Sequence, residues 1–332
     1  MCIRDREEVS MLALGDSYTI GEQVEEQERW PHQFAAALRK EGVKVGEPDY
    51  VATTGWTTSD LLEGMSGSLS HEKQYNLVSI LIGVNNQYQG LDVDLYEPEL
   101  REIIEQALAI AGGLRSRVFM LSIPDYAYTP FGEGDPGISR EIDAYNAIKE
   151  RVAREYGISF IDITPISRQA LSEPDLVAGD GLHPSGAQYG AWIKKLLTEV
   201  KIPSKDDMAD FREIKAIFFQ QEKDWNQGDI NAFMEAYWKS DELQFGGASG
   251  ITKGWNETLA SYKAGYPDRA SMGQLSFHIK DLTRQSKDVV SLTGSWELIR
   301  ENDRPGGHFL LIWKKLQGEW KIVADHTSQY CQ

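Results

Sequence analysis

A serine near the start of the chain and an acid and a base far along it could together perform acyl transfer. Gly15-Asp16-Ser17 follows the apolar run Val9 to Leu14, and Asp180 and His183 stand three positions apart in Asp180-Gly181-Leu182-His183-Pro184. Serine, histidine and aspartate are the groups that this chemistry requires. Gly-Asp-Ser alone is also an ordinary combination for a turn or a helix cap, so the distant Asp180 and His183 carry the interpretation.

Short β-rich runs alternate with longer helical patterns through residues 1–200. This alternation predicts βαβ units and a parallel sheet covered by helices on both faces. Functional groups gather at the carboxyl ends of the strands in such a sheet. The predicted strands are Val9 to Leu14, Asp49 to Ala52, Leu77 to Ile82, Val118 to Ile123 and Ser159 to Ile163, and the predicted helices include Trp30 to Lys40, Glu97 to Ala111, Ile138 to Tyr156 and a last one to about Val200.

Four short blocks follow strands of this predicted sheet. They are Gly15-Asp16-Ser17, Thr53-Thr54-Gly55-Trp56, Gly83-Val84-Asn85-Asn86 and Asp180 to His183, after the first, second, third and fifth strands. The order Ser, Gly, Asn, His resembles the GDSL or SGNH hydrolase superfamily over about residues 9–200. The resemblance implies an α/β fold with a three-layer, flavodoxin-like parallel sheet.

The resemblance also implies a role for each block. Ser17 would be the nucleophile, His183 the general base and Asp180 its orienting partner. The Ser17 N–H, the Gly55 N–H and the Asn85 side-chain amide would form the oxyanion hole, and no metal or organic cofactor is expected. Taken singly, Asn85 is more often a turn residue and Gly55 a loop glycine.

General chemistry supports these roles. A serine hydroxyl attacks only if a base takes its proton, and histidine suits that exchange at neutral pH. A carboxylate on the other ring nitrogen fixes the tautomer. Two positions depart from the superfamily pattern: Tyr18 stands where Leu is expected, and Asn86 stands where Asp commonly follows. Neither removes a reacting atom, so we expect both to affect substrate preference.

Aromatic residues adjoin the blocks and are predicted to bind substrate. A hydrophobic acyl or aryl group could lie against them, although aromatic residues near strand ends are usually part of the core. They are Tyr18, Trp56, Tyr88 and Tyr126.

The pattern changes after a polar stretch containing Pro203, which we interpret as a linker between residues 1–204 and 205–332. Helical patterns come first in the second segment and strands of antiparallel character follow, which predicts an α+β domain. The predicted helices are Phe211 to Asn226, Ile230 to Trp238 and Trp255 to Tyr266, and the predicted strands are Gln274 to Leu282, Val289 to Arg300, His308 to Lys315 and Glu319 to Asp325.

Several motifs of this segment resemble the SnoaL-like or ketosteroid-isomerase-like cone family. They are Asp224-Trp225-Asn226-Gln227-Gly228-Asp229, the Phe233 to Phe245 stretch, Gly254-Trp255 and Ala324-Asp325-His326-Thr327-Ser328. The resemblance covers about residues 208–328 and implies a curved antiparallel sheet around a pocket, in an enzyme, a binding module or a dimerising module.

Strict alternation in the last strand places Trp320 and Ile322 on one face with His326, and Asp325 on the other. Asp325 and His326 therefore cannot form a dyad in one cavity, which disfavours an isomerase. We expect dimerisation or ligand binding instead, with a homodimer formed through sheet faces rich in Trp and Phe.

Charge and composition restrict the partners of this 332-residue chain. Residues 1–200 carry 17 Lys and Arg against 32 Asp and Glu, a net charge of −15, whereas residues 201–332 carry 17 against 19, a net charge of −2. Such acidity disfavours binding to nucleic acid or an anionic membrane. The two cysteines, Cys2 and Cys331, lie at the ends, so no disulfide framework or metal-ligand spacing is present in the sequence.

No apolar run is long enough to span a membrane, and no apolar stretch of signal-peptide length precedes the first strand. These features predict a cytoplasmic location, although residues 1–6 read like translated adapter sequence, which leaves room for a lost leader.

These observations together predict a serine esterase that hydrolyses a small-molecule carboxylic ester through an acyl-enzyme on Ser17. The C-terminal cone would dimerise the chain or bind a ligand. The alternative is a binding or scaffold protein whose function resides in the pocket of the cone. Intact Ser17, Asp180 and His183 argue against an inactive scaffold.

Overall fold

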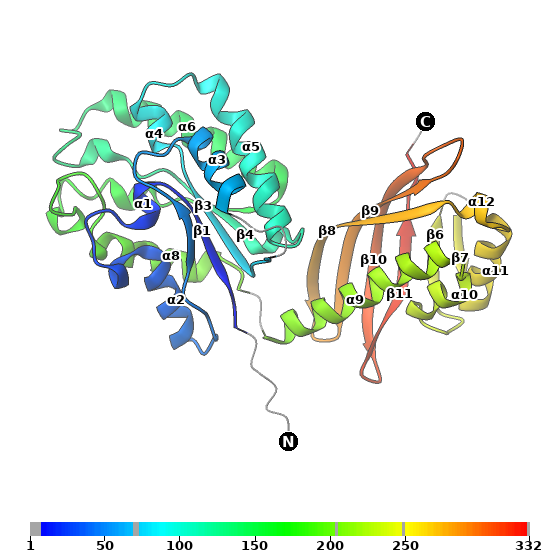
Figure 1. The fold of residues 1–332 in the computed structure, drawn as a ribbon. Helices are drawn as coiled ribbons and strands as arrows, with labels where there is room; N and C mark the ends of the chain where they lie inside the picture. The colour runs from blue at the N-terminus through cyan, green and yellow to red at the C-terminus, as the bar shows by residue number, and fades with distance from the viewer. Residues whose placement is uncertain (1–7, 69–72, 203–204, 248–249, 331–332) are drawn as a thin grey trace. The chain divides into compact units, whose positions relative to one another are not determined.

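The computed structural model describes residues 8–68, 73–202, 205–247 and 250–330. The chain divides into two compact units, Met1–Pro203 and Ser204–Gln332, here called the first and second unit (Figure 1). Cys2 and Cys331 lie outside the described residues. Within the described part of the chain, no helix has the length and apolarity to cross a membrane.

The first unit is built on a five-stranded parallel sheet with the order β2-β1-β3-β4-β5. Every residue of β1 and β3 is buried, as expected for a sheet covered on both faces. The last residue of β1, Gly15, pairs with Ala52 of β2 and with Leu81 of β3, so these three strands end at the same edge. The strands are β1 (Met11–Gly15), β2 (Asp49–Ala52), β3 (Leu77–Leu81), β4 (Val118–Leu121) and β5 (Ser159–Ile161).

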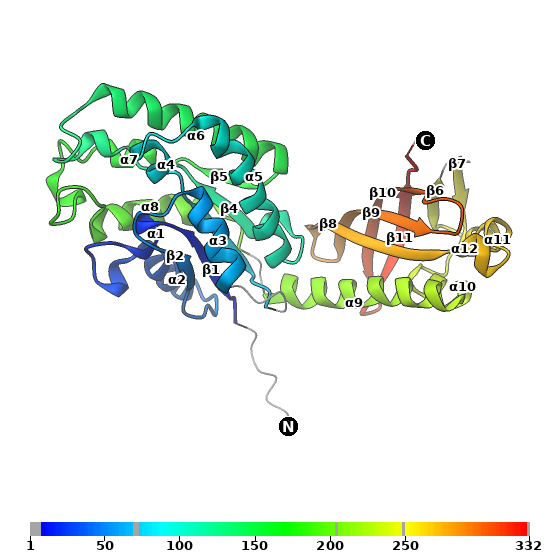
Figure 2. The ribbon, with the colours of Figure 1, turned by 45° about the horizontal axis from the view of Figure 1, so that its top comes forward.

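Helices cover this sheet in two layers (Figure 2). On one face α2 (Trp30–Lys40) packs against α8 (Gly186–Glu199), and on the other α3 (Thr58–Ser68), α5 (Val93–Ile110) and α6 (Pro136–Tyr156) pack side by side. The three-layer α/β fold predicted from the sequence is confirmed. The shorter helices are α1 (Ser17–Ile20), α4 (Val84–Tyr88) and α7 (Thr164–Ser167), with 3-10 turns at Glu26–Glu28, Arg115–Arg117, Tyr126–Tyr128 and Pro174–Leu176.

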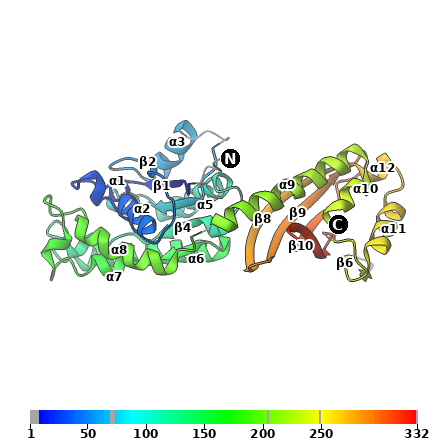
Figure 3. The same ribbon diagram turned by 90° about the horizontal axis from the view of Figure 1, so that it is seen from below.

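The second unit is a six-stranded, mostly antiparallel sheet that curves around helix α9 (Lys205–Gln227) (Figure 3). The strand order is β7-β6-β11-β10-β9-β8, and only the β6–β11 pair is parallel. The α+β cone is confirmed. The strands are β6 (Gln244–Gly247), β7 (Gly250–Lys253), β8 (Gln274–Ser286), β9 (Val289–Ile299), β10 (Gly306–Leu316) and β11 (Glu319–Thr327), and the other helices are α10 (Ile230–Phe233), the 3-10 turn Met234–Ala236, α11 (Trp255–Gly265) and α12 (Arg269–Met272).

A β-bulge in β11 overturns the face predicted for Asp325. Ile312 of β10 pairs with Ala324, but the next residue, Trp313, pairs with Ile322, so Val323 has no partner in β10. The extra residue reverses the alternation beyond it. Asp325 is therefore buried on the same side as Trp320 and Ile322, whereas His326 is exposed.

Large aromatic side chains of the second sheet lie inside the unit. Trp313 and Trp320 are fully buried, and Phe309 is buried. The expectation that Trp and Phe of the sheet lie on an exposed dimerisation face is therefore wrong for these residues.

Candidate functional site

Ser17 is held at the point where β1 turns into α1. Asp16 caps α1 by accepting a hydrogen bond from the Tyr18 N–H at 3.0 Å, so Ser17 begins the helix directly beyond the strand. A Cβ at Gly15 would lie 2.1 Å from Thr19 Oγ1 and 2.2 Å from the Leu81 carbonyl oxygen. Only glycine allows this close approach, which brings the serine back over the edge of the sheet.

Asp180 and His183 form a compact acid–base pair in the loop before α8. The His183 Nδ1 lies 2.5 Å from Asp180 Oδ2, while Asp180 Oδ1 accepts the backbone N–H groups of Leu182 and His183 at 2.9 and 3.0 Å. Burial raises the pKa of Asp180, but its hydrogen bonds with His183 and these N–H groups outweigh burial and hold the pKa below the ordinary value. Asp180 is therefore a carboxylate at neutral pH, as an orienting partner must be.

The Ser17 segment and the His183 loop are in contact. The ring of Tyr18, next to Ser17, lies 5.4 Å from the His183 ring, centre to centre. From α8, the Tyr189 hydroxyl donates to the Tyr18 carbonyl oxygen at 3.1 Å. The structure thus brings together residues that are far apart in the sequence.

The predicted oxyanion donors follow the two strands that flank β1. Gly55 has a φ of +83°, which favours glycine, and the space that its Cβ would enter is open. Asn85 lies in α4 and donates one amide N–H to the Trp56 carbonyl oxygen at 2.9 Å. A primary amide has a second N–H, which this bond leaves for another acceptor.

Asn86 has a structural role that the sequence analysis did not foresee. It is buried, accepts the Thr58 N–H at 3.0 Å and donates to the Thr58 hydroxyl at 2.7 Å. These bonds join the first residue of α3, just after the loop that contains Gly55, to α4. Asn86 thus positions backbone, and no observation connects it with substrate preference.

The four aromatic residues predicted to bind substrate differ in exposure. Tyr18 and Tyr126 are buried, and Tyr126 donates its hydroxyl hydrogen to Gln87 at 2.9 Å. The half-buried ring of Trp56 packs over Gly64 of α3. Tyr88 is 59% exposed, so among the four it has the most surface available to a ligand.

Phe131 was missed in the sequence and completes an aromatic cluster near the acid–base loop. Its ring centre lies 6.1 Å from that of Tyr88 and 6.2 Å from that of Tyr126, and its side chain is 50% exposed. Its N–H donates to the Gly181 carbonyl oxygen at 3.0 Å, between Asp180 and His183. No sequence signal distinguishes Phe131 from an ordinary loop aromatic residue.

Two buried ionisable groups, Asp16 next to the nucleophile and Lys149, act on each other electrostatically. Lys149 of α6 is fully buried and donates to the Ile82 carbonyl oxygen at 2.9 Å. Burial raises the pKa of Asp16 and lowers the pKa of Lys149, and the charge of each residue partly offsets that effect on the other. The sequence signal for Lys149 was a lysine on the apolar face of a helix, between Tyr145 and Val152.

The sequence profile of the GDSL-like Lipase/Acylhydrolase family matches residues 13–191. The match spans more than half of the chain and includes every residue of the predicted site. The chain belongs to this family. The GDSL-like family comprises acylhydrolases, so the chain is a hydrolase by membership. A search of curated proteins found no match.

Solved structures resemble each unit of this GDSL-like protein. The acetylxylan esterase Axe2 from Geobacillus stearothermophilus is 20% identical, over 59% of this chain and 96% of its own, with a TM-score of 0.46. The esterase EstA from Pseudoalteromonas sp. is 15% identical, over 58% of this chain and 97% of its own, with a TM-score of 0.46. An NTF-2-like protein of unknown function from Shewanella oneidensis MR-1 is 38% identical, over 36% of this chain and 98% of its own, with a TM-score of 0.35.

Proposed function

We propose that the protein is a carboxylic ester hydrolase that works through an acyl-enzyme on Ser17. The observation that carries the proposal is the 2.5 Å contact between His183 Nδ1 and Asp180 Oδ2, in a loop that touches the Ser17 segment. With Nδ1 occupied, Nε2 is the ring nitrogen available to take the serine proton. Family membership supports the same chemistry.

In this mechanism Ser17 Oγ attacks the ester carbonyl while His183 Nε2 accepts its proton. The N–H groups of Ser17 and Gly55 and the second N–H of Asn85 stabilise the negative oxygen of the tetrahedral intermediate. His183 then protonates the leaving alcohol, and an acyl-serine remains. Water activated by His183 releases the acid and restores Ser17.

The substrate would be a small ester with an apolar part. Tyr88 and Phe131 are both about half exposed and in mutual contact, and Phe131 is bonded to the loop of the acid–base pair. We propose that they bind the acyl or aryl group. A screen of p-nitrophenyl esters of increasing chain length, with sugar acetates and lysolipids alongside, would identify the class.

The direct test replaces Ser17 and His183. Ser17→Ala and His183→Ala should each abolish hydrolysis of p-nitrophenyl acetate and leave the circular dichroism spectrum unchanged, because both residues lie in segments beyond strand ends. Turnover above a few per cent in either variant would contradict the proposal.

For the second unit we propose ligand binding, because it contains a partly open cavity of about 340 Å³ with a buried carboxyl group, Asp325. Homodimerisation through this unit and a cytoplasmic location stay predictions from the sequence.

A further inference from the structure

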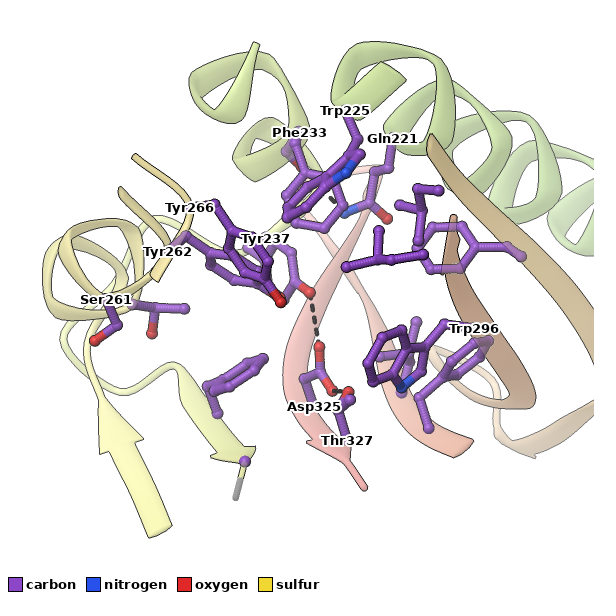
Figure 4. A pocket seen from close by; sticks show the side chains of 18 of the residues that line it. Gln221, Trp225, Phe233, Tyr237, Ser261, Tyr262, Tyr266, Trp296, Asp325 and Thr327 are labelled. Atoms are coloured by element: carbon purple, nitrogen blue, oxygen red, sulfur yellow. Dashed lines mark hydrogen bonds between the residues drawn. The ribbon is translucent and has the colours of Figure 1, made fainter. Parts of the chain in front are cut away.

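A cavity of about 340 Å³ lies between the helices of the second unit and the inner face of its sheet (Figure 4). This volume is near the lower end for small-molecule sites, which span about 300–1,000 Å³. Aromatic side chains dominate the walls: Phe218, Trp225, Phe233, Tyr237, Phe245, Tyr262, Tyr266, Phe277, Trp296 and Phe309.

The aromatic rings form two walls. In one, the ring centre of Tyr262 lies 5.3 Å from that of Phe233 and 5.5 Å from that of Phe245. In the other, Phe277 stacks on Phe218 at 4.4 Å. The face of an aromatic ring is electronegative, so a ring whose face borders the cavity would attract a cation.

Among the described residues that line this cavity, Asp325 is the one with a carboxyl group. It is 5% exposed, and its two oxygens accept hydrogen bonds from the Tyr237 and Thr327 hydroxyls, each at 2.7 Å (Figure 4). Burial raises the pKa of Asp325 to about 6, although these two hydrogen bonds partly offset it. At neutral pH it is therefore mainly a buried anion.

No Lys, Arg or His is among the described residues that line the cavity, and the basic group that acts on the charge of Asp325 is the exposed His326, next to it in β11. A buried carboxylate without a counter-charge costs several kcal/mol, and the aromatic walls do not reduce that cost. A positively charged occupant would reduce it.

Several other polar groups of the cavity lining have partners within the protein. Gln221 donates to the Phe233 carbonyl oxygen, and the Trp225 and Trp296 indoles donate to the carbonyl oxygens of Met272 and Ser328. Thr258 and Ser261 donate to carbonyl oxygens of their own helix region. The two indole N–H groups and the Thr258 and Ser261 hydroxyl hydrogens are thus engaged, whereas Asp325 retains lone pairs for a ligand that donates.

We propose that this cavity binds a protonated organic amine with a flat apolar body, whose ammonium group pairs with Asp325 while the body lies between the aromatic walls. The inference rests on the ligand-binding role proposed for the second unit and is independent of the chemistry at Ser17.

The test compares three probes of nearly equal size and different charge on the full-length protein: 2-phenylethylammonium, 2-phenylethanol and phenylacetate. Binding is followed by calorimetry and by the fluorescence of Trp225 and Trp296. We expect the cation to bind at least about 10-fold more tightly than the alcohol, a difference of about 1.4 kcal/mol. Phenylacetate should show no saturable binding.

Asp325→Asn should lower the affinity for 2-phenylethylammonium to the level of the affinity for 2-phenylethanol. The affinity for 2-phenylethanol should stay unchanged, and this result would show that the cavity is intact in the variant. The matched control is Glu319→Gln, an exposed acid in the same strand, which should change neither affinity.

Three outcomes would overturn the proposal. Equal affinities for 2-phenylethanol and 2-phenylethylammonium would show that the cavity binds ligands without selecting for positive charge. Preferred binding of phenylacetate would reverse the predicted sign. Absence of saturable binding of 2-phenylethylammonium up to about 10 mM would show that the cavity does not bind an amine of this type. Hydrolysis of p-nitrophenyl acetate by the same samples reports separately on Ser17.

Discussion

At the scale of single residues, Asp180 both folds the loop that carries His183 and orients the histidine ring. One carboxylate oxygen accepts two backbone N–H groups, and the other accepts the ring N–H. The base is thus oriented by a residue only three positions away. Because this geometry is local, the spacing in the sequence was enough to predict it.

Asn85 provides the prediction that belongs to this scale. Asn85→Ala should lower kcat by roughly 100-fold to 1000-fold and change KM little, because an oxyanion donor acts mainly on the transition state. Steady-state kinetics with p-nitrophenyl acetate would measure this. A raised KM with normal kcat would make Asn85 a substrate contact instead.

Gln89 is a matched control for this variant. It directly follows α4, is exposed, and donates to the Gly55 carbonyl oxygen at 3.3 Å. Gln89→Ala thus removes a side-chain amide bound to the same loop, and it should keep kcat within a few-fold of the parent.

At the scale of elements, Lys149 connects α6 to the carboxyl end of β3 beside Asp16. Its ammonium group is fully buried and hydrogen-bonded to the Ile82 carbonyl oxygen. Lys149→Met removes the donor to the buried Ile82 carbonyl oxygen and the positive group that acts on Asp16, and it should destabilise the first unit by about 1–3 kcal/mol.

Urea denaturation of the Lys149→Met variant and of the double variant with Asp16→Asn would measure this effect. The double variant should recover part of the lost unfolding free energy, because Asp16→Asn removes the buried acid, whereas the Ile82 carbonyl oxygen still lacks its donor. A loss below about 1 kcal/mol in the single variant would show that the pair contributes little.

The bulge at Val323 explains why the face of Asp325 could not be predicted. Alternation along a strand assigns faces only while each residue has one partner, and an extra residue reverses every face beyond it. The residues Val323, Ala324 and Asp325 give no local signal of the bulge, which is defined by the pairing of β11 with β10.

The buried position of Asp325 predicts a pH dependence of stability. The pKa is raised to about 6 in the folded chain from 3.8, so the folded form keeps a proton that the unfolded form loses between about pH 4 and 6. Stability of the second unit should therefore fall by up to about 3 kcal/mol as the pH rises through this range.

Asp325→Asn should remove this dependence, because an amide does not ionise. Urea denaturation of the parent protein and of Asp325→Asn at pH 4.5 and 7 would measure the difference in their free energies of unfolding at each pH. If the difference in unfolding free energy stays constant between the two pH values, the pKa of Asp325 in the folded chain is not raised above its value in the unfolded chain.

At the scale of the whole molecule, the order of elements followed from the sequence more closely than their boundaries. The β2 strand and the α2 helix lie where predicted, whereas α9 begins six residues before the predicted Phe211. The strands β6 and β7 were missed, because Gly246, Gly247 and Gly250 weaken the strand pattern.

The division of labour between the units gives a prediction at this scale. The net charge of −15 on residues 1–200 should discourage contact between two copies of this segment, whereas residues 201–332 carry only −2. We expect residues 1–204 alone to be an active monomer and residues 205–332 alone to form a dimer.

Light scattering on the two fragments, with an esterase assay on the first, would test this expectation. A monomeric second fragment would remove the proposed dimer. An inactive first fragment that regains activity when the second is added would mean that the cone contributes to catalysis.

The central claim is that Ser17 is the acylated nucleophile, and labelling with a fluorophosphonate followed by peptide mass spectrometry tests it most directly. The account predicts one adduct per chain, located on Ser17, with none in Ser17→Ala and much slower labelling in His183→Ala. An adduct on another residue, or undiminished labelling of Ser17→Ala, would contradict it.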